Sequence, residues 1–82
     1  MLEQDIRRLL IDQLRPRLER MGLNAQDLTD DLDLLNSGVL DSLGLVDLLS
    51  GLETHTGTTI DLDQALARKG ATTVSGIVRL FS

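Results

Sequence analysis

No cysteine, tryptophan or tyrosine occurs in this 82-residue chain, and phenylalanine and proline occur once each. The missing cysteines exclude disulfide bonds, thiolate metal sites and any chemistry by a protein thiol. With Phe81 as the one aromatic residue, the core must be aliphatic, and leucine should be its main component. A chain of this length is near the lower limit for a self-supporting core, so residues 1–82 are predicted to form a single domain.

Positive charge is missing from the middle of the chain. Residues 22–63 contain nine acidic residues and no lysine or arginine, whereas residues 64–82 contain three cations and no acid. The net charge of the whole chain is −5. An uninterrupted acidic segment repels the phosphates of nucleic acids, which argues against a nucleic-acid partner. Its natural complement is a basic protein surface, which long-range attraction would steer toward it.

Long apolar runs are also absent, so we expect no membrane-spanning segment. Acidic residues at positions 3 and 5 do not fit the start of a signal peptide, and we expect that none is present. The lack of cysteine is compatible with a reducing compartment. The expected location is therefore cytoplasmic. We also expect the protein to act as a monomer.

Apolar residues recur at intervals of three and four and nothing alternates with period two, which predicts an all-α bundle. The first helix is expected over residues 2–21, with a kink or break near Arg15, because Pro16 inside a helix costs about 3 kcal/mol. Gly22 should end this helix. A long loop is expected over residues 23–40, and its apolar side chains should reach the core.

Three further helices are expected after this loop. The second should run from residue 42 to residue 53 or 54. A short third helix should follow Asp61, whose side chain can cap it, and should end by Gly70. The last helix should start at Thr72 or Thr73. It should bury four apolar residues in helical spacing: Val74, Ile77, Val78 and Phe81.

The second helix carries apolar residues on two sides. One side should face the core, and it contains Leu45, Leu48, Leu49 and Leu52. Leu43 and Val46 lie instead on the other side, together with Asp47. Two neighbouring exposed apolar residues at the head of a helix indicate a surface for a partner protein. The alternative is that the short third helix covers them.

The pair Asp41-Ser42 stands at the start of this second helix. By itself such a pair most often only caps a helix, because the aspartate accepts hydrogen bonds from the first-turn amides. Here a long loop delivers Ser42 to a helix start, where its hydroxyl would be exposed. A phosphate attached to it would meet free backbone N–H groups and the positive end of the helix dipole.

The stretch "GVLDSLGLVDLLSGLE" resembles the prosthetic-group site of acyl carrier proteins, and the likeness covers the whole chain. It implies a four-helix acyl-carrier-like bundle with a long loop between helices 1 and 2 and a short third helix. Ser42 would carry 4'-phosphopantetheine, transferred covalently from coenzyme A by a phosphopantetheinyl transferase, and Asp41 would help to bind the magnesium ion of that transfer. Positions with which the family contacts its partner enzymes match Leu43, Val46, Asp47 and Glu53.

The cargo stays open at this point. The second helix is less acidic than in bacterial fatty-acid carriers, and Gly44 stands where an acidic residue is common. The pattern "SGVLDSLGLVDLL" is also similar to the D-alanyl carrier proteins of cell-wall modification. The cargo is therefore either an acyl group of fatty-acid or polyketide type or an activated amino acid. The partners implied are a loading ligase and downstream synthase or transferase enzymes.

Other classes of function fit less well. The segment "DLDLLNSGVLDS" lacks the ligands of a calcium loop, because it places Leu35, Asn36 and Ser42 where an oxygen ligand, glycine and glutamate are needed, so no metal site is expected. An enzyme is not expected, because the only histidine, His55, lies about three turns from Ser42 and is interpreted as a solvated loop residue. The non-carrier alternative is an unmodified acidic adaptor that binds a basic protein through the second helix.

Five arginines in the first 21 residues are interpreted as a solvated face of the first helix, with a second docking surface as the alternative. They are Arg7, Arg8, Arg15, Arg17 and Arg20.

Overall fold

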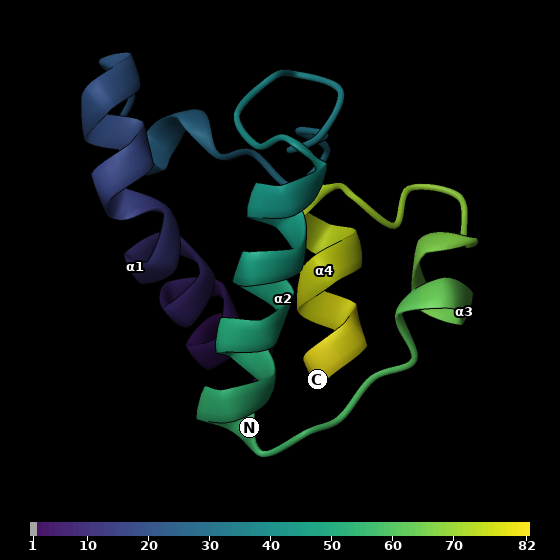
Figure 1. Cartoon of the computed structure of the whole chain (residues 1–82). Helices are drawn as coiled ribbons and strands as arrows, with labels where there is room; N and C mark the ends of the chain where they lie inside the picture. The colour runs from purple at the N-terminus through teal and green to yellow at the C-terminus, as the bar shows by residue number, and fades with distance from the viewer. Residues whose placement is uncertain (1) are drawn as a thin grey trace.

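A computed structural model describes residues 2–82 as a bundle of α-helices (Figure 1). The elements in chain order are α1 (Glu3–Met21), the short 3-10 helix η1 (Ala25–Asp27), α2 (Ser42–Thr56), α3 (Leu62–Leu66) and α4 (Val74–Phe81). No strand occurs within residues 2–82, and the one β-type contact is an isolated antiparallel bridge. The predicted all-α fold with a long loop and a short third helix is confirmed.

Helix α1 buries a stripe of residues four apart, Ile6, Leu10, Leu14 and Leu18. Gly22 ends it with a positive φ of 73°, and the N–H of Leu23 donates to the carbonyl oxygen of Leu18. Of the kink or break expected near Arg15, the break is wrong, because α1 continues as one helix through Pro16. Pro16 lies on the exposed side of the helix, so the buried stripe continues past it and packing outweighs the lost hydrogen bond.

Helix α2 buries the predicted core face of Leu45, Leu48, Leu49 and Leu52. It extends to Thr56, slightly further than predicted. In its last turn, the hydroxyls of Thr54 and Thr56 donate to the carbonyl oxygens of Ser50 and Leu52, four residues earlier. Gly57, with a φ of 73°, then ends the helix.

Hydrogen bonds attach the long loop to the start of α4. The N–H of Leu34 donates to the carbonyl oxygen of Thr72 at 2.9 Å, and the N–H of Val74 donates to that of Leu32 at 3.0 Å. Apolar side chains of the loop pack into the core, as predicted. Those buried in the core are Leu28, Leu34, Val39 and Leu40. The loop is therefore held in place although it contains little regular structure.

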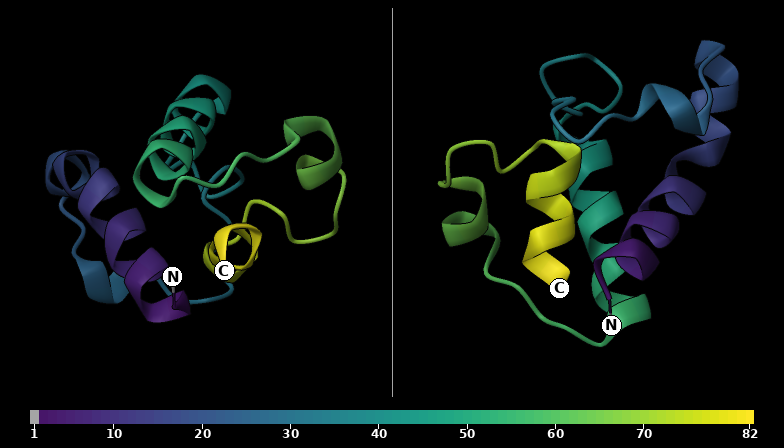
Figure 2. Two further views of the ribbon diagram at one scale, coloured as in Figure 1. Left: turned by 90° about the horizontal axis from the view of Figure 1, so that it is seen from below. Right: turned by 180° about the vertical axis from the view of Figure 1, so that it is seen from behind.

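The helices are arranged around one aliphatic core, with α1 packed against both α2 and α4 (Figure 2). Helix α3 stands apart at the edge of the molecule and buries only Ala65. Among the helices described, none combines the length and the apolar character that crossing a membrane requires. The starts of α2 and α4 lie at the same end of the bundle (Figure 1).

Candidate functional site

Ser42 is the first residue of α2, and its side chain is exposed. Its hydroxyl makes no hydrogen bond within residues 2–82. The N–H groups of Ser42 and Leu43 also find no acceptor among these residues. An α-helix leaves such first-turn donors free and carries a positive partial charge at this end. A phosphate ester on Ser42 would therefore be solvent-accessible and would lie beside unpaired donors.

Asp41 caps the helix in the way its sequence position predicts. The N–H of Gly44 donates to Asp41 Oδ1 at 2.6 Å, and the N–H of Leu45 donates to the Asp41 carbonyl oxygen at 2.9 Å. The second carboxylate oxygen accepts no hydrogen bond from residues 2–82, and the side chain is exposed. One oxygen thus orients the carboxylate, while the other is free to bind a cation.

The approach to Ser42 requires a turn with a glycine. Gly38 has a φ of 84°, a backbone region that side chains disfavour, and its N–H donates to the carbonyl oxygen of Leu35 at 3.2 Å. The chain then returns, and the N–H of Leu40 donates to the carbonyl oxygen of Leu34 at 2.9 Å. Because Leu40 is buried directly before Asp41, this fold-back fixes where α2 begins.

Asp33 holds this loop together, a role that the sequence reasoning missed. Its carboxylate accepts hydrogen bonds from the N–H of Leu35 and the N–H of Asn36, both at 3.0 Å, and from the Asn36 side chain at 2.7 Å. It also accepts one from the Thr72 hydroxyl at 2.7 Å. The N–H of Asn36, the Thr72 hydroxyl and the other donors lower the pKa of Asp33, and the effect outweighs the opposing desolvation. Aspartate two residues before a turn is the signal that could have identified it.

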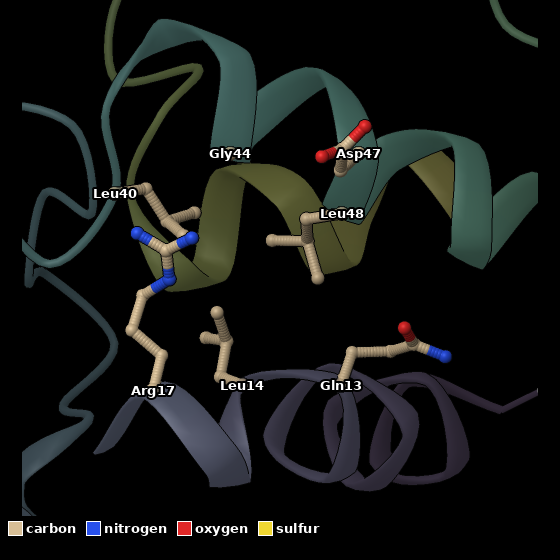
Figure 3. A pocket seen from close by; sticks show the side chains of 7 residues that line it. All are labelled: Gln13, Leu14, Arg17, Leu40, Gly44, Asp47 and Leu48. Atoms are coloured by element: carbon tan, nitrogen blue, oxygen red, sulfur yellow. The ribbon is translucent and has the colours of Figure 1, made fainter. Parts of the chain in front are cut away.

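A cavity of about 120 Å³ lies between α1 and the first turns of α2 (Figure 3). Gly44 is buried against it, and a Cβ atom there would lie 3.0 Å from Asp41 Oδ1 and 3.2 Å from Arg17 Nη2. Figure 3 shows the Arg17 guanidinium reaching from α1 toward Leu40 and Gly44, whereas the Asp47 carboxylate points away from α1. The bare backbone of Gly44 thus makes room for an arginine under the start of α2.

The interpretation of the arginines as a solvated face is therefore only partly right. Arg17 is half-buried under α2. Arg7 forms an ion pair with Asp30 in the long loop, and Arg15 forms one with Asp12 at 3.1 Å. Arg8 and Arg20 are exposed as predicted. Arg7 and Arg17 contact residues that are distant in the sequence and that only the folded chain brings near. The pair of Arg15 with Asp12 is local to α1.

The outer side of α2 stays uncovered. Leu43 is 72% exposed and Val46 is 38% exposed, and the Asp47 side chain beside them is exposed too. The alternative that the third helix covers these residues is wrong, because α3 stands apart. Glu53 differs from them: it is half-buried, and its carboxylate accepts a hydrogen bond from the N–H of Ile60 at 3.1 Å.

His55 lies in the last turn of α2, not in a loop, and its Nδ1 atom is 2.8 Å from the carbonyl oxygen of Gly51. The interpretation as a loop residue is wrong in this detail, although the side chain is exposed. Within residues 2–82, no group of three histidine, aspartate or glutamate side chains is placed to hold a metal ion.

Comparison with known families decides the class of this site. Residues 6–81 match the family model of the phosphopantetheine attachment site. The chain belongs to this family. No curated protein and no solved structure shows a significant match.

The family match confirms the resemblance to acyl carrier proteins and the covalent cofactor 4'-phosphopantetheine. It also supports the role of a phosphopantetheine carrier. The start of α2 fits this group chemically, because it presents a free hydroxyl for the phosphodiester, unpaired N–H donors for its phosphate and a carboxylate oxygen for a cation.

Proposed function

We propose that this chain is a single-domain acyl carrier protein whose 4'-phosphopantetheine is attached to Ser42. The observation that carries the proposal is the exposed Ser42 hydroxyl, free of hydrogen bonds within residues 2–82 and placed at the start of α2 directly after Asp41. The family match supports the carrier role, and the chain order of loop, Asp41 and Ser42 supports the position.

Each residue at the start of α2 has a separate task in this proposal. Ser42 supplies the oxygen of the phosphodiester. Asp41 keeps the first turn in place through Gly44 and offers its other carboxylate oxygen to the magnesium ion of the transfer reaction. The bound group supplies a thiol for thioester formation, and this chain contains no cysteine of its own. The partner enzymes carry out the chemistry, so the chain acts as a carrier and not as an enzyme.

The outer side of α2 is the proposed docking surface for these enzymes. Leu43 and Val46 offer exposed apolar area, and Asp47 offers charge to a basic partner. Glu53 belongs to the same side of the helix, but one of its carboxylate oxygens accepts a hydrogen bond from the N–H of Ile60. The partners would be a phosphopantetheinyl transferase, a loading ligase, and synthase or transferase enzymes that receive the cargo, all acting on a monomer in the cytoplasm.

The test is modification by a broad-specificity phosphopantetheinyl transferase, read out as intact mass. The wild-type chain should gain one phosphopantetheine group, and Ser42→Ala should gain none while keeping its helical circular-dichroism spectrum. Ser37→Ala and Ser50→Ala, which remove other exposed hydroxyls, are the matched controls and should be modified like wild type. A folded wild-type chain that gains no mass would favour the unmodified acidic adaptor instead.

A further inference from the structure

The three cations of residues 64–82 gather around one groove. Two adjoining cavities of about 230 and 280 Å³ lie between α3 and α4, and both are lined by Arg68, Arg79, Ala65 and Leu80. Lys69 lines the first of them. Many of the residues that line the groove are small. Helix α3 stands away from the rest of the bundle (Figure 2).

The side chains of these cations are not engaged elsewhere. The ion pairs found within residues 2–82 involve only Arg7 and Arg15 on α1. Asp61 is the one acidic residue that lines the groove, and its Oδ1 already accepts from the N–H groups of Asp63 and Gln64 as the cap of α3. The groove is therefore a positively charged region on a protein with a net charge of −5.

Backbone amides do not supply this positive character. The first N–H groups of α4 are all used: that of Val74 donates to Leu32, that of Ser75 to Asp30, and that of Gly76 to the Thr73 hydroxyl, each at 3.0 Å. Attraction for an anion thus rests on the three long cationic side chains. Their reach and number suit a carboxylate, which guanidinium groups bind through paired hydrogen bonds.

The groove runs along α4, from Thr73 at the end of the bundle where α2 also starts to Arg79 in the last turn of α4. The N–H of Leu40, two residues before Ser42, donates to the carbonyl oxygen of Leu34, whose N–H donates to the carbonyl oxygen of Thr72. The next residue, Thr73, lines the groove. Two backbone hydrogen bonds thus tie the loop before Ser42 to the segment that leads into the groove, and the starts of α2 and α4 lie at the same end of the bundle (Figure 1).

We propose that the groove between α3 and α4 binds the negatively charged end of a short acyl cargo held on the arm at Ser42, an inference that rests on the proposed function. A cargo ending in a carboxylate is attracted by Arg68, Lys69 and Arg79. The ammonium group of an aminoacyl cargo is repelled by them, and a plain alkyl end gains nothing from charge. The groove therefore selects carboxylate-ended acyl groups over amino acids.

The experiment loads the full chain with three cargoes that differ only at their ends. A broad-specificity transferase would attach glutaryl, pentanoyl or 5-aminopentanoyl phosphopantetheine from the matching coenzyme A thioesters, and intact mass would confirm each product. Amide chemical shifts are then compared by NMR. The glutaryl form should shift the signals of Lys69, Gly76 and Arg79, and the other two forms should not. The shifts should fade in about 1 M salt, where charges are screened within roughly 3 Å.

Variants separate the groove from general effects of charge. Arg68→Gln with Arg79→Gln should abolish the glutaryl-dependent shifts, whereas Arg8→Gln with Arg20→Gln, on the exposed side of α1, should leave them unchanged. If the chain is loaded but all three cargoes cause equal amide shifts, or glutaryl causes none, the proposed cargo site in the groove is wrong. The proposed carrier function would be unaffected by that result. Failure of the chain to load at all would contradict the carrier function itself and the groove with it.

Discussion

Asp33 shows how much of the site depends on one side chain. Its carboxylate accepts hydrogen bonds from Leu35, from Asn36 twice and from Thr72, so it closes the turn before Gly38 and ties it to the start of α4. The loop that it holds is the same loop that leads to Ser42. Loss of Asp33 should therefore lower stability and disturb Ser42, the proposed attachment residue.

Asp33→Ala should lower the free energy of unfolding by roughly 1–3 kcal/mol, because several donors, one of them 39 residues away, lose a charged acceptor. Urea denaturation followed by circular dichroism measures this. Asp33→Asn, which keeps one acceptor oxygen, should cost less. Equal stability of the Ala variant and wild type would show that solvent replaces these bonds without loss.

The same residue makes a prediction about pH. Because the pKa of Asp33 is lowered on folding, chiefly by the hydrogen bond from the Asn36 N–H, its charged form stabilises the fold at neutral pH. That contribution is present above the unfolded pKa of about 3.9 and disappears as pH falls through the lower folded value. The difference in unfolding free energy between wild type and Asp33→Asn should therefore shrink in acid. A difference that stays constant with pH would contradict the assignment.

At the scale of elements, packing overrides local preference where the buried face is continuous. Pro16 should break a helix, yet α1 passes through it, since Leu14 and Leu18 on either side remain buried. The glycines inside helices show that the effect of a substitution on stability depends on the atoms around it. Gly51 lies inside α2 and Gly76 in the first turn of α4, so helix propensity alone would favour alanine at both positions.

Gly51→Ala should raise the free energy of unfolding by about 0.5–1 kcal/mol, because alanine restricts the unfolded chain. The new Cβ atom would meet only the end of the exposed Gln13 side chain, which can move away. Gly76→Ala is the matched comparison and should be destabilising, because its Cβ atom would collide with the backbone carbonyl oxygen of Gly70. Thermal melts of both variants test this prediction. A change in stability of the same sign for both variants would show that the atoms around each glycine do not determine the effect.

At the scale of the whole molecule, the charge that follows α1 is divided between two regions. Residues 22–63 are purely acidic, and they include α2 with its exposed Leu43 and Val46. Residues 64–82 are purely basic and line the groove beside α3. A partner with a basic surface would approach the first region, and an anionic cargo would settle in the second. The net charge of −5 thus includes contributions from two surfaces that attract ions of opposite sign.

The value of kcat/KM for phosphopantetheinyl transfer should fall as salt is added, because attraction by the acidic side chains of α2 speeds the encounter. Asp47→Asn should lower kcat/KM at low salt and make the salt dependence less steep, while Asp63→Asn, on the distant α3, should change neither. Kinetics with the apo chain over a range of sodium chloride concentrations measure this. A rate unaffected by both salt and Asp47 would mean that docking is not electrostatic.

Sequence alone was sufficient to predict the order of the helices and the residues that cap the starts of α2 and α3. Asp41, Asp61 and Thr73 cap helices as their spacing indicates, and the core leucines of α2 face inward as predicted. The motif around Ser42 already indicated the family that the comparison confirmed. These features depend on neighbours within about one helical turn, which is the range over which spacing and capping act.

Only the tertiary structure decided which distant residues meet. It placed Arg17 under Gly44, paired Arg7 with Asp30, and left Leu43 uncovered by α3. It also collected the three cations of residues 64–82 around one groove. Such contacts join residues that no local sequence pattern links. Burial of the shared core sets the direction in which the helices pack, and this direction decides which residues each exposed charge faces.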